Sequence, residues 1–383
     1  MTTTELDTSH VTPSESEHDE SGWDWPLFGA VALLAAFGLL VILSASSADA
    51  DRIYGYPFHY IARQSIGLGI GCTLAGVLLT IPWRWLRRSI WPSYLVSLGL
   101  LVAVLSPMGH SAKGATRWLA LGPMNFQPSE LAKLALIAAL AHYLACNEGR
   151  LKDVVGVAVP GLSLLLPLVA LIVFQKDFGT TVILLGLTGV LLFVAGLQKR
   201  WLVGGAALAV CGLVAMVLAE PYRIKRLTAF LDPFADPDAA GYQIVQGWIA
   251  LATGGATGNG MAAGVAQRGF LPEPHTDFIS AVIGEELGAI GWTIAVGLQM
   301  FLVWRVLEVG ERARDLFGTL VCTGVAVLFG SQAIINLGVV AGMLPAKGLV
   351  LPFLSYGASA VIVHALAVGF VLRIGLESKR EVS

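Results

Sequence analysis

The chain has 383 residues, of which 56% are hydrophobic and only 13% are charged. An ordinary soluble domain carries about 25% charged residues, so this composition excludes a water-soluble fold. The formal net charge is only −2, and the basic residues are scattered between apolar runs, which excludes the basic surface patch of a nucleic-acid-binding protein. No nucleic-acid partner is expected.

The first 25 residues differ in composition from the rest of the chain. They are rich in Ser, Thr, Asp and Glu and contain no Lys or Arg. Such a segment cannot bury enough apolar surface to offset the entropy cost of folding, so we expect residues 1–25 to form a disordered acidic tail. The apolar run that follows is too long, and its flank too acidic, for a signal peptide.

Apolar runs long enough to cross a membrane, which takes about 20 residues, recur along the remaining chain. They cover residues 26–45, 64–82, 90–107, 129–147, 154–174, 178–198, 201–219, 278–304, 316–343 and 357–375. These ten runs predict an all-α polytopic membrane protein, with ten transmembrane helices in one domain over residues 26–376. Residues 377–383 are expected to form a short tail, and residues 220–277 a long outer loop between the seventh and eighth helices.

The distribution of Lys and Arg between the connections predicts which side of the membrane each connection faces. One alternate set of connections holds thirteen of these residues, all in short loops or close to helix ends, and the other set holds eleven. The positive-inside rule therefore places the first set, and both termini, in the cytoplasm. Five residues of the other set run against this rule in short loops or at outer helix ends: Lys113, Arg117, Lys133, Lys176 and Lys347. They predict a polar, partly cationic cavity that opens outward and suits an anionic ligand.

The first candidate site runs from an outer loop into a helix that is expected to begin near Pro128. Lys113 and Arg117 lie in the loop, and Glu130 and Lys133 lie in the first turns of the helix. Residues three apart on a helix share one face, so Glu130 and Lys133 can pair. A local ion pair at the start of a helix and a ligand-binding role both remain open.

A polar hinge between two spans forms the second candidate site, with Gln175 before it and Asp177 at the start of the next helix. An acid at a helix start is stabilised by the helix dipole by about 0.3 to 1 kcal/mol. Capping the helix is therefore a sufficient reason for Asp177, and a place in the cavity is the alternative.

The predicted outer loop over residues 220–277 is far longer than an ordinary connection, and loops of this length are typically functional or disordered. Its content of Tyr, Trp, Phe and Ile argues against disorder. Arg223 lies near its beginning, and Asp277 is the last residue before the next apolar run. An acid in that place is either a helix cap or a general base, and the sequence leaves both open.

Two acidic residues, Glu285 and Glu286, lie within the apolar run that follows Asp277. An ionised acid at the centre of a spanning helix costs about 2.5 to 3.5 kcal/mol, so it should face a partner or a wet cavity. For Glu285, an ion pair with Lys133 and a place in the cavity are both open. Further along, Pro and Gly interrupt the apolar sequence around Ser355, and we expect this non-helical segment to line the cavity.

Several short motifs, in their order along the chain, resemble those of the SEDS (shape, elongation, division and sporulation) family. They are KGATRW at 113–118, QPSELAK at 127–133, QKDFGT at 175–180, EPYR at 220–223, LPEPHTDFI at 271–279, GEELG at 284–288 and LPFLSYGAS at 351–359. The resemblance covers nearly all of residues 26–376, and it is closer to the division-type members than to the elongation-type members. Two departures are Lys176, where the family usually has Pro, and Ala358, where it usually has Gly.

The resemblance implies a ten-helix protein of the inner membrane that polymerises lipid II into the glycan strands of peptidoglycan at the outer face. A division-type member would act at the septum. The family's essential acid falls on Asp277. The partners that the resemblance implies are lipid II, a class B penicillin-binding protein, other membrane proteins of the division machinery and membrane lipid.

The resemblance and the charges together predict a role for each candidate residue. Asp277 is the expected general base of an inverting glycosyl transfer. The residues expected to bind the pyrophosphate or the sugar are Lys113, Arg117, Lys133, Arg223, Lys347 and Ser355, and those expected to orient or support them are Glu130, Asp177, Glu285 and Gln175. A divalent cation, Mg²⁺ or Mn²⁺, is the expected cofactor, with no ligands assigned. The alternatives are a transporter that flips lipid II, an elongation-type polymerase, and a scaffold that recruits a cell-wall enzyme.

Overall fold

A computed structural model describes residues 23–112, 115–121, 124–150, 153–235, 241–265, 270–345 and 348–380. Most of the predicted acidic tail, two of the predicted ligand-binding lysines, Lys113 and Lys347, and the last three residues of the chain lie outside this described part. All other candidate site residues fall inside it.

Eight helices of the described part are long and apolar enough to cross a membrane. They are α1 (Trp25–Tyr54), α2 (His59–Thr80), α5 (Pro128–Cys146), α6 (Val159–Phe174, preceded by a π turn over Val154–Ala158), α8 (Lys199–Leu218), α11 (Ile279–Glu311), α12 (Leu316–Val340) and α13 (Ala358–Arg380). Two shorter apolar helices, α4 (Ile90–Val104) and α7 (Phe178–Val194), lie among them. Because each predicted apolar run overlaps one of these helices, the prediction of a polytopic membrane protein is confirmed.

Three features differ from the sequence prediction. The connection before α5 folds into an antiparallel sheet of order β1-β2-β3, formed by β1 (Gly109–Ala112), β2 (Ala115–Leu121) and β3 (Met124–Phe126), so the fold is not purely helical. The long loop contains two further helices, α9 (Pro221–Leu231) and α10 (Tyr242–Gly254). Helix α13 continues four residues beyond the predicted domain end at residue 376, to Arg380, and Glu377 pairs there with Arg373 one turn earlier.

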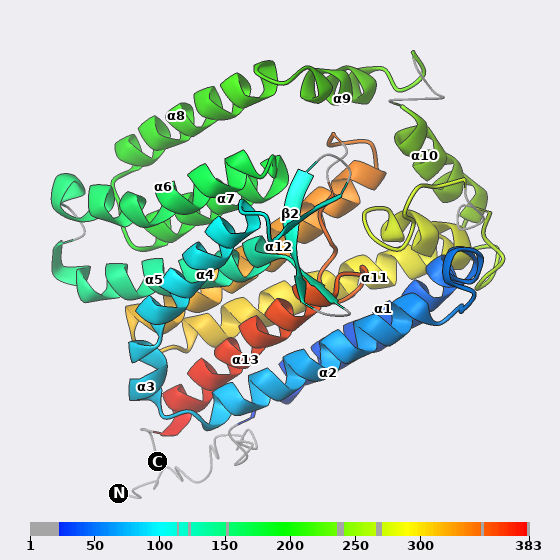
Figure 1. Ribbon diagram of the computed structural model, residues 1–383. Helices are drawn as coiled ribbons and strands as arrows, with labels where there is room; N and C mark the ends of the chain where they lie inside the picture. Colours follow the sequence, from blue (N-terminus) through cyan, green and yellow to red (C-terminus); the bar gives the residue numbers. More distant parts are fainter. Residues whose placement is uncertain are drawn as a thin grey trace, which may run out of the picture.

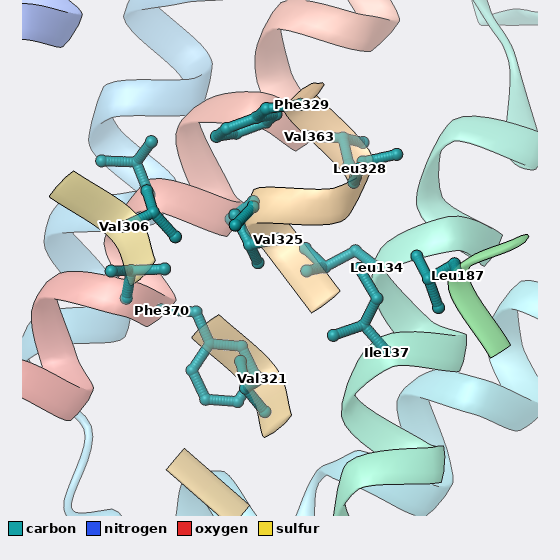
Figure 2. Packing of buried hydrophobic residues seen from close by; sticks show 14 of the residues in the cluster. Leu134, Ile137, Leu187, Val306, Val321, Val325, Leu328, Phe329, Val363 and Phe370 are labelled. Atoms are coloured by element: carbon teal, nitrogen blue, oxygen red, sulfur yellow. The ribbon is translucent and has the colours of Figure 1, made fainter. Parts of the chain in front are cut away.

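The core of the bundle lies around α12, which packs against α5, α7, α11 and α13. Figure 2 shows Val321, Val325 and Phe329 of α12 among the side chains of neighbouring helices, with Val321 beside Phe370 of α13. Inside a membrane the lipid is as apolar as these side chains, so van der Waals packing holds the helices together. Helix α8, in contrast, has no buried residue and lies apart from the bundle in Figure 1.

The two ends of the bundle carry different structures. At one end α1 begins and α13 ends (Figure 1), the N-cap Asp24 of α1 pairs with Arg305 of α11, and Arg373 of α13 bonds to the carbonyl that follows α2. The short helix α3 (Trp83–Arg88) lies at this end as well. The other end carries the sheet, the α6–α7 hinge and the segment between α12 and α13. These irregular segments form part of the wall of the cavity described next, together with residues of α2 and α9.

Candidate active site

A cavity of about 860 Å³ lies among these irregular segments. Its charged lining residues are five cations, Arg63, Arg117, Lys176, Arg223 and Arg226, and four carboxylates, Glu130, Asp177, Glu273 and Asp277. Ionisable side chains at membrane depth are tolerated where they line a wet cavity, which explains why they gather here. The expectation of a polar, partly cationic cavity is met, and such a lining suits a ligand with both hydroxyl and anionic groups.

Asp277 lies just before α11, at the edge of the cavity, and is partly exposed. The N-cap position of α11 is Phe278, with no side-chain cap bond, so Asp277 does not occupy the cap position that was one of its two predicted roles. Phe278 is buried in a small cluster with α10 and α12, and the backbone carbonyl of Asp277 accepts a hydrogen bond of 3.0 Å from Asn336. The backbone is therefore anchored on both sides while the carboxylate stays accessible.

Glu130 and Lys133 form the local ion pair that their spacing predicted. The Lys133 ammonium lies 2.8 Å from the Glu130 carboxylate, and its side chain is completely buried. Pro128 and Glu130 occupy the first turn of α5, also as predicted. Glu130 lines the cavity, whereas Lys133 is buried behind Glu130. Lys133 can therefore act on the cavity only by holding the Glu130 carboxylate in place.

The hinge between α6 and α7 is held by Arg117 of β2. The Arg117 guanidinium donates to the carbonyl oxygens of Gln175, at 3.4 Å, and Lys176, at 2.6 Å, and lies 3.9 Å from the Asp177 carboxylate. Lys176 has a φ of 60°, a left-handed conformation that a non-glycine residue adopts only when its surroundings enforce it. Asp177 caps α7 and accepts from the backbone and hydroxyl of Thr180, so the predicted capping role is present. Arg117 thus shapes the cavity wall that it also lines.

Helix α9 contributes Arg223 and Arg226 to the cavity lining. The Arg223 guanidinium donates to the Met216 carbonyl at 2.5 Å and lies over the Phe178 ring, 5.7 Å from its centre. Next to it, Lys176 of the hinge pairs with Glu220, the N-cap of α9, at 3.6 Å. These contacts attach α9 to the hinge, although its neighbour α8 has no buried residue.

Besides Lys133, three predicted site residues of the described part do not line this cavity. The hydroxyl of Ser355 accepts from the backbone N–H of Leu351 and is buried within that turn. Glu285 is also buried, and its carboxylate accepts from the backbone N–H of Val265 at 2.7 Å. Gln175 is buried and donates to the Leu101 carbonyl of α4, which ties the hinge to that helix. Their places suit structural support, which was the predicted role of Glu285 and Gln175 but not of Ser355.

The structure adds residues that the sequence reasoning did not single out as site residues. Arg63 of α2 and Tyr356, before α13, line the cavity together. Burial raises the pKa of the Tyr356 phenol, although a hydrogen bond from Arg63 counters part of this rise. One feature of the sequence could have identified Arg63. It is a cation next to an apolar run, on the side of the membrane where the positive-inside rule disfavours cations.

Comparison with known proteins gives one consistent result. A family model described as "Cell cycle protein", for FtsW, RodA and SpoVE, matches residues 24–380. The probable peptidoglycan glycosyltransferase FtsW of Geobacter sp. (strain M18) is 39% identical over 354 residues, which are 92% of this chain and 96% of that protein.

Two solved structures are similar to the whole fold. A chain of a peptidoglycan synthase complex that coordinates polymerization and crosslinking has a TM-score of 0.76 at 34% identity, over 94% of this chain and 99% of that one. The rod shape determining protein RodA of Thermus thermophilus has a TM-score of 0.69 at 32% identity, over 94% and 98% of the two chains. Since sequence and fold agree over almost the full length, the chain belongs to the cell cycle protein family of FtsW, RodA and SpoVE, the SEDS family.

Proposed function

We propose that this chain is a peptidoglycan glycosyltransferase that polymerises lipid II into glycan strands for the septal cell wall. The observation that carries the proposal is the cavity, in which the Asp277 carboxylate shares one space with five cationic side chains. A lipid-linked sugar pyrophosphate needs both, because the acceptor hydroxyl must lose a proton and the leaving group is anionic. The relative named as a probable glycosyltransferase FtsW supports this activity and the division role.

In the proposed reaction, the Asp277 carboxylate takes the proton from the 4-hydroxyl of the acceptor's GlcNAc. The hydroxyl oxygen attacks the anomeric carbon of the donor's MurNAc, and the bond from that carbon to the pyrophosphate breaks. Undecaprenyl pyrophosphate leaves, and the α-linkage of the donor becomes a β-linkage in the strand. The partial exposure of Asp277 at the cavity supports this role, because a general base must be within hydrogen-bond reach of its proton.

The cations of the cavity divide into two groups in this scheme. Arg63, Arg223 and Arg226 line the space itself, and we propose that they offset the charge of the leaving pyrophosphate. Arg117 is bonded to the hinge carbonyls and Lys176 is paired with Glu220, so these two keep the wall in shape. Lys133, behind the cavity, supports the wall through its pair with Glu130. Of the binding residues that the sequence predicted, this proposal keeps Arg223, and it adds Arg63 and Arg226.

We propose that a divalent cation binds in the cavity together with the substrate, whose phosphates supply most of its ligands. In the described part of the chain, no three His, Cys, Asp or Glu side chains are grouped to hold a metal ion. Mg²⁺ is commonly held by one or two carboxylates together with substrate phosphates. We propose Glu273, a cavity carboxylate that the scheme otherwise leaves unused, as the protein ligand, and neutralisation of pyrophosphate charge as the chemistry that the ion supplies.

The proposal includes a membrane topology and a partner. All ten apolar helices would cross the membrane, with both termini in the cytoplasm and the cavity open to the outer face. Three arginines of α3 lie at the end where α1 begins, which supports this orientation by the positive-inside rule. The similar chain from a synthase complex that coordinates polymerization and crosslinking supports a class B penicillin-binding protein as partner.

The test is to purify the chain with its cognate class B penicillin-binding protein, supply lipid II and Mn²⁺, and separate the products on a gel. We expect glycan polymer from the complex and none from the partner alone. Lipid II flipping in vesicles without any polymer in this assay would overturn the proposal in favour of a transporter.

A small substitution beside Asp277 is expected to slow the reaction without unfolding the protein. A Cβ atom at Gly348 would lie 3.0 Å from one carboxylate oxygen of Asp277 and 3.4 Å from the other, so Gly348→Ala must displace the carboxylate. Misplacing a catalytic group by about 1 Å can cost roughly a hundredfold. The shift forced here is a few tenths of an ångström, so we expect about a three- to tenfold fall in the polymerisation rate.

The control for this substitution is Gly161→Ala in α6, where a Cβ would meet only side chains at 3.5 Å or more. Rates are compared at equal amounts of folded protein, as judged by gel filtration. Equal rates for the two variants would show that the position of the Asp277 carboxylate does not limit the reaction.

A further inference from the structure

We propose that Asn336 is a positioning residue for Asp277. In this inference, the buried Asn336 amide joins the segment before α11 to the segment after α12 and thereby sets where the Asp277 carboxylate lies. The inference rests on the proposed function, because it assigns Asn336 a role in the same reaction.

Asn336 is a polar residue inside the apolar helix α12, with 1% of its surface exposed. Its amide nitrogen donates to two backbone carbonyls, that of Asp277 at 3.0 Å and that of Leu349 at 2.8 Å. Its amide oxygen accepts from the hydroxyl of Ser280, in the first turn of α11, at 3.2 Å. Both N–H groups and the oxygen of the amide are therefore engaged, which holds the side chain in one orientation.

The two carbonyls belong to backbone outside the helices, where no regular ladder satisfies them. Leaving such a group unpaired in an apolar surrounding is unfavourable, because it loses its hydrogen bond to water without gaining another. Because one nitrogen serves both carbonyls, it also fixes how closely the two segments approach. Gly348, the neighbour of Leu349, lies against the Asp277 carboxylate at this point of approach. The Asn336 amide thus sets the surroundings of the carboxylate without touching it.

Two other buried amides hold the same segment after α12, but from different sides. Gln64 of α2 donates to the Ser355 carbonyl and accepts from the Gly357 N–H, and Gln299 of α11 donates to the Pro352 carbonyl at 2.6 Å. Gln299 is 2% exposed, so its burial matches that of Asn336. Of these three amides, only Asn336 has a hydrogen bond to the backbone of Asp277 among the described contacts. Gln299 is therefore a matched control. It carries the same amide group with similar burial and holds the same segment, but it has no described hydrogen bond to Asp277.

The experiment compares the wild type, Asn336→Leu, Gln299→Leu and Ser280→Ala, each purified in complex with the penicillin-binding partner. Melting temperature and steady-state polymerisation of lipid II are measured for each. We expect Asn336→Leu to lower kcat by at least tenfold with KM within about threefold of wild type, since the base is misplaced but the binding cations remain. Gln299→Leu is expected to lower the melting temperature and to keep kcat within about threefold.

Ser280→Ala covers the case in which Asn336→Leu fails to fold. It removes the bond that orients the amide and leaves both carbonyl acceptors in place, so we expect a smaller fall in kcat, about threefold, at an unchanged melting temperature. An unchanged kcat in Ser280→Ala, or an equal loss of kcat in Asn336→Leu and Gln299→Leu, would contradict the inference. A rise in KM at constant kcat would contradict it as well.

Hydrogen–deuterium exchange separates this inference from the proposed function. We expect faster exchange of backbone amides over residues 275–282 in Asn336→Leu than in Gln299→Leu, whether or not the protein makes polymer. If the wild type makes no polymer, the proposed function fails, while equal exchange of this segment in the two variants would overturn the anchoring by Asn336.

Discussion

Asp277→Asn is expected to abolish detectable glycan polymer while the protein remains folded and bound to its partner. The amide has nearly the shape of the carboxylate but cannot take a proton, and loss of a general base typically costs about 10²- to 10⁴-fold in rate. The anchor from Asn336 is to the backbone carbonyl of Asp277, so it survives the substitution. The measurement is the gel assay with lipid II at equal amounts of folded complex.

The matched control is Asp177→Asn on the same cavity. Asp177 caps α7 by accepting from Thr180, and Asn is as good an N-cap residue as Asp. We therefore expect this variant to lose less than about tenfold in rate. Polymer from Asp277→Asn at the wild-type rate would remove Asp277 from the mechanism, and equal losses in both variants would point to the net charge of the cavity instead.

Lys133→Met is expected to destabilise the protein strongly. Lys133 is completely buried, and its only described ion pair is with Glu130, at 2.8 Å. Removing one partner of a buried pair leaves an uncompensated charge and typically costs about 3 to 5 kcal/mol. The melting temperature of the purified protein should therefore fall by several degrees. The activity should fall with it, because Glu130 lines the cavity.

Two controls show whether the pair itself is responsible. The double variant Glu130→Leu with Lys133→Met removes both charges and should recover most of the melting temperature, since apolar replacement of a whole buried pair is often nearly neutral. Arg52→Met breaks a pair of the same spacing with Asp49, in which the Arg52 side chain is 70% exposed, and pairs with such an exposed partner contribute little. A Lys133→Met protein that melts within about one degree of wild type would show that the Glu130–Lys133 pair does not stabilise the fold.

Local features of the fold and of the site followed from residue spacing alone. The apolar runs located the helices because a segment that crosses lipid must satisfy its own backbone and present apolar side chains. The pairing of Glu130 with Lys133 and the capping of α7 by Asp177 were predictable because both partners lie within one helical turn. The position of Asp277 before an apolar run was also visible in the sequence.

Features that depend on distant parts of the chain were not visible in the same way. The strands β1, β2 and β3 are short and are stable only when they pair with one another. No single stretch of the sequence therefore predicts the sheet. The neighbours of Asp277 could not be read from the sequence, because Asn336 lies 59 positions away and reaches it through the packing of α12 on α11. The sequence could not show which cations are accessible to a ligand. In the structure Lys133 is buried inside the bundle, whereas Arg63 lines the cavity. Residue types and spacing along one helix decide local pairing, whereas the meeting of segments at the end of the bundle is decided by how all the helices pack.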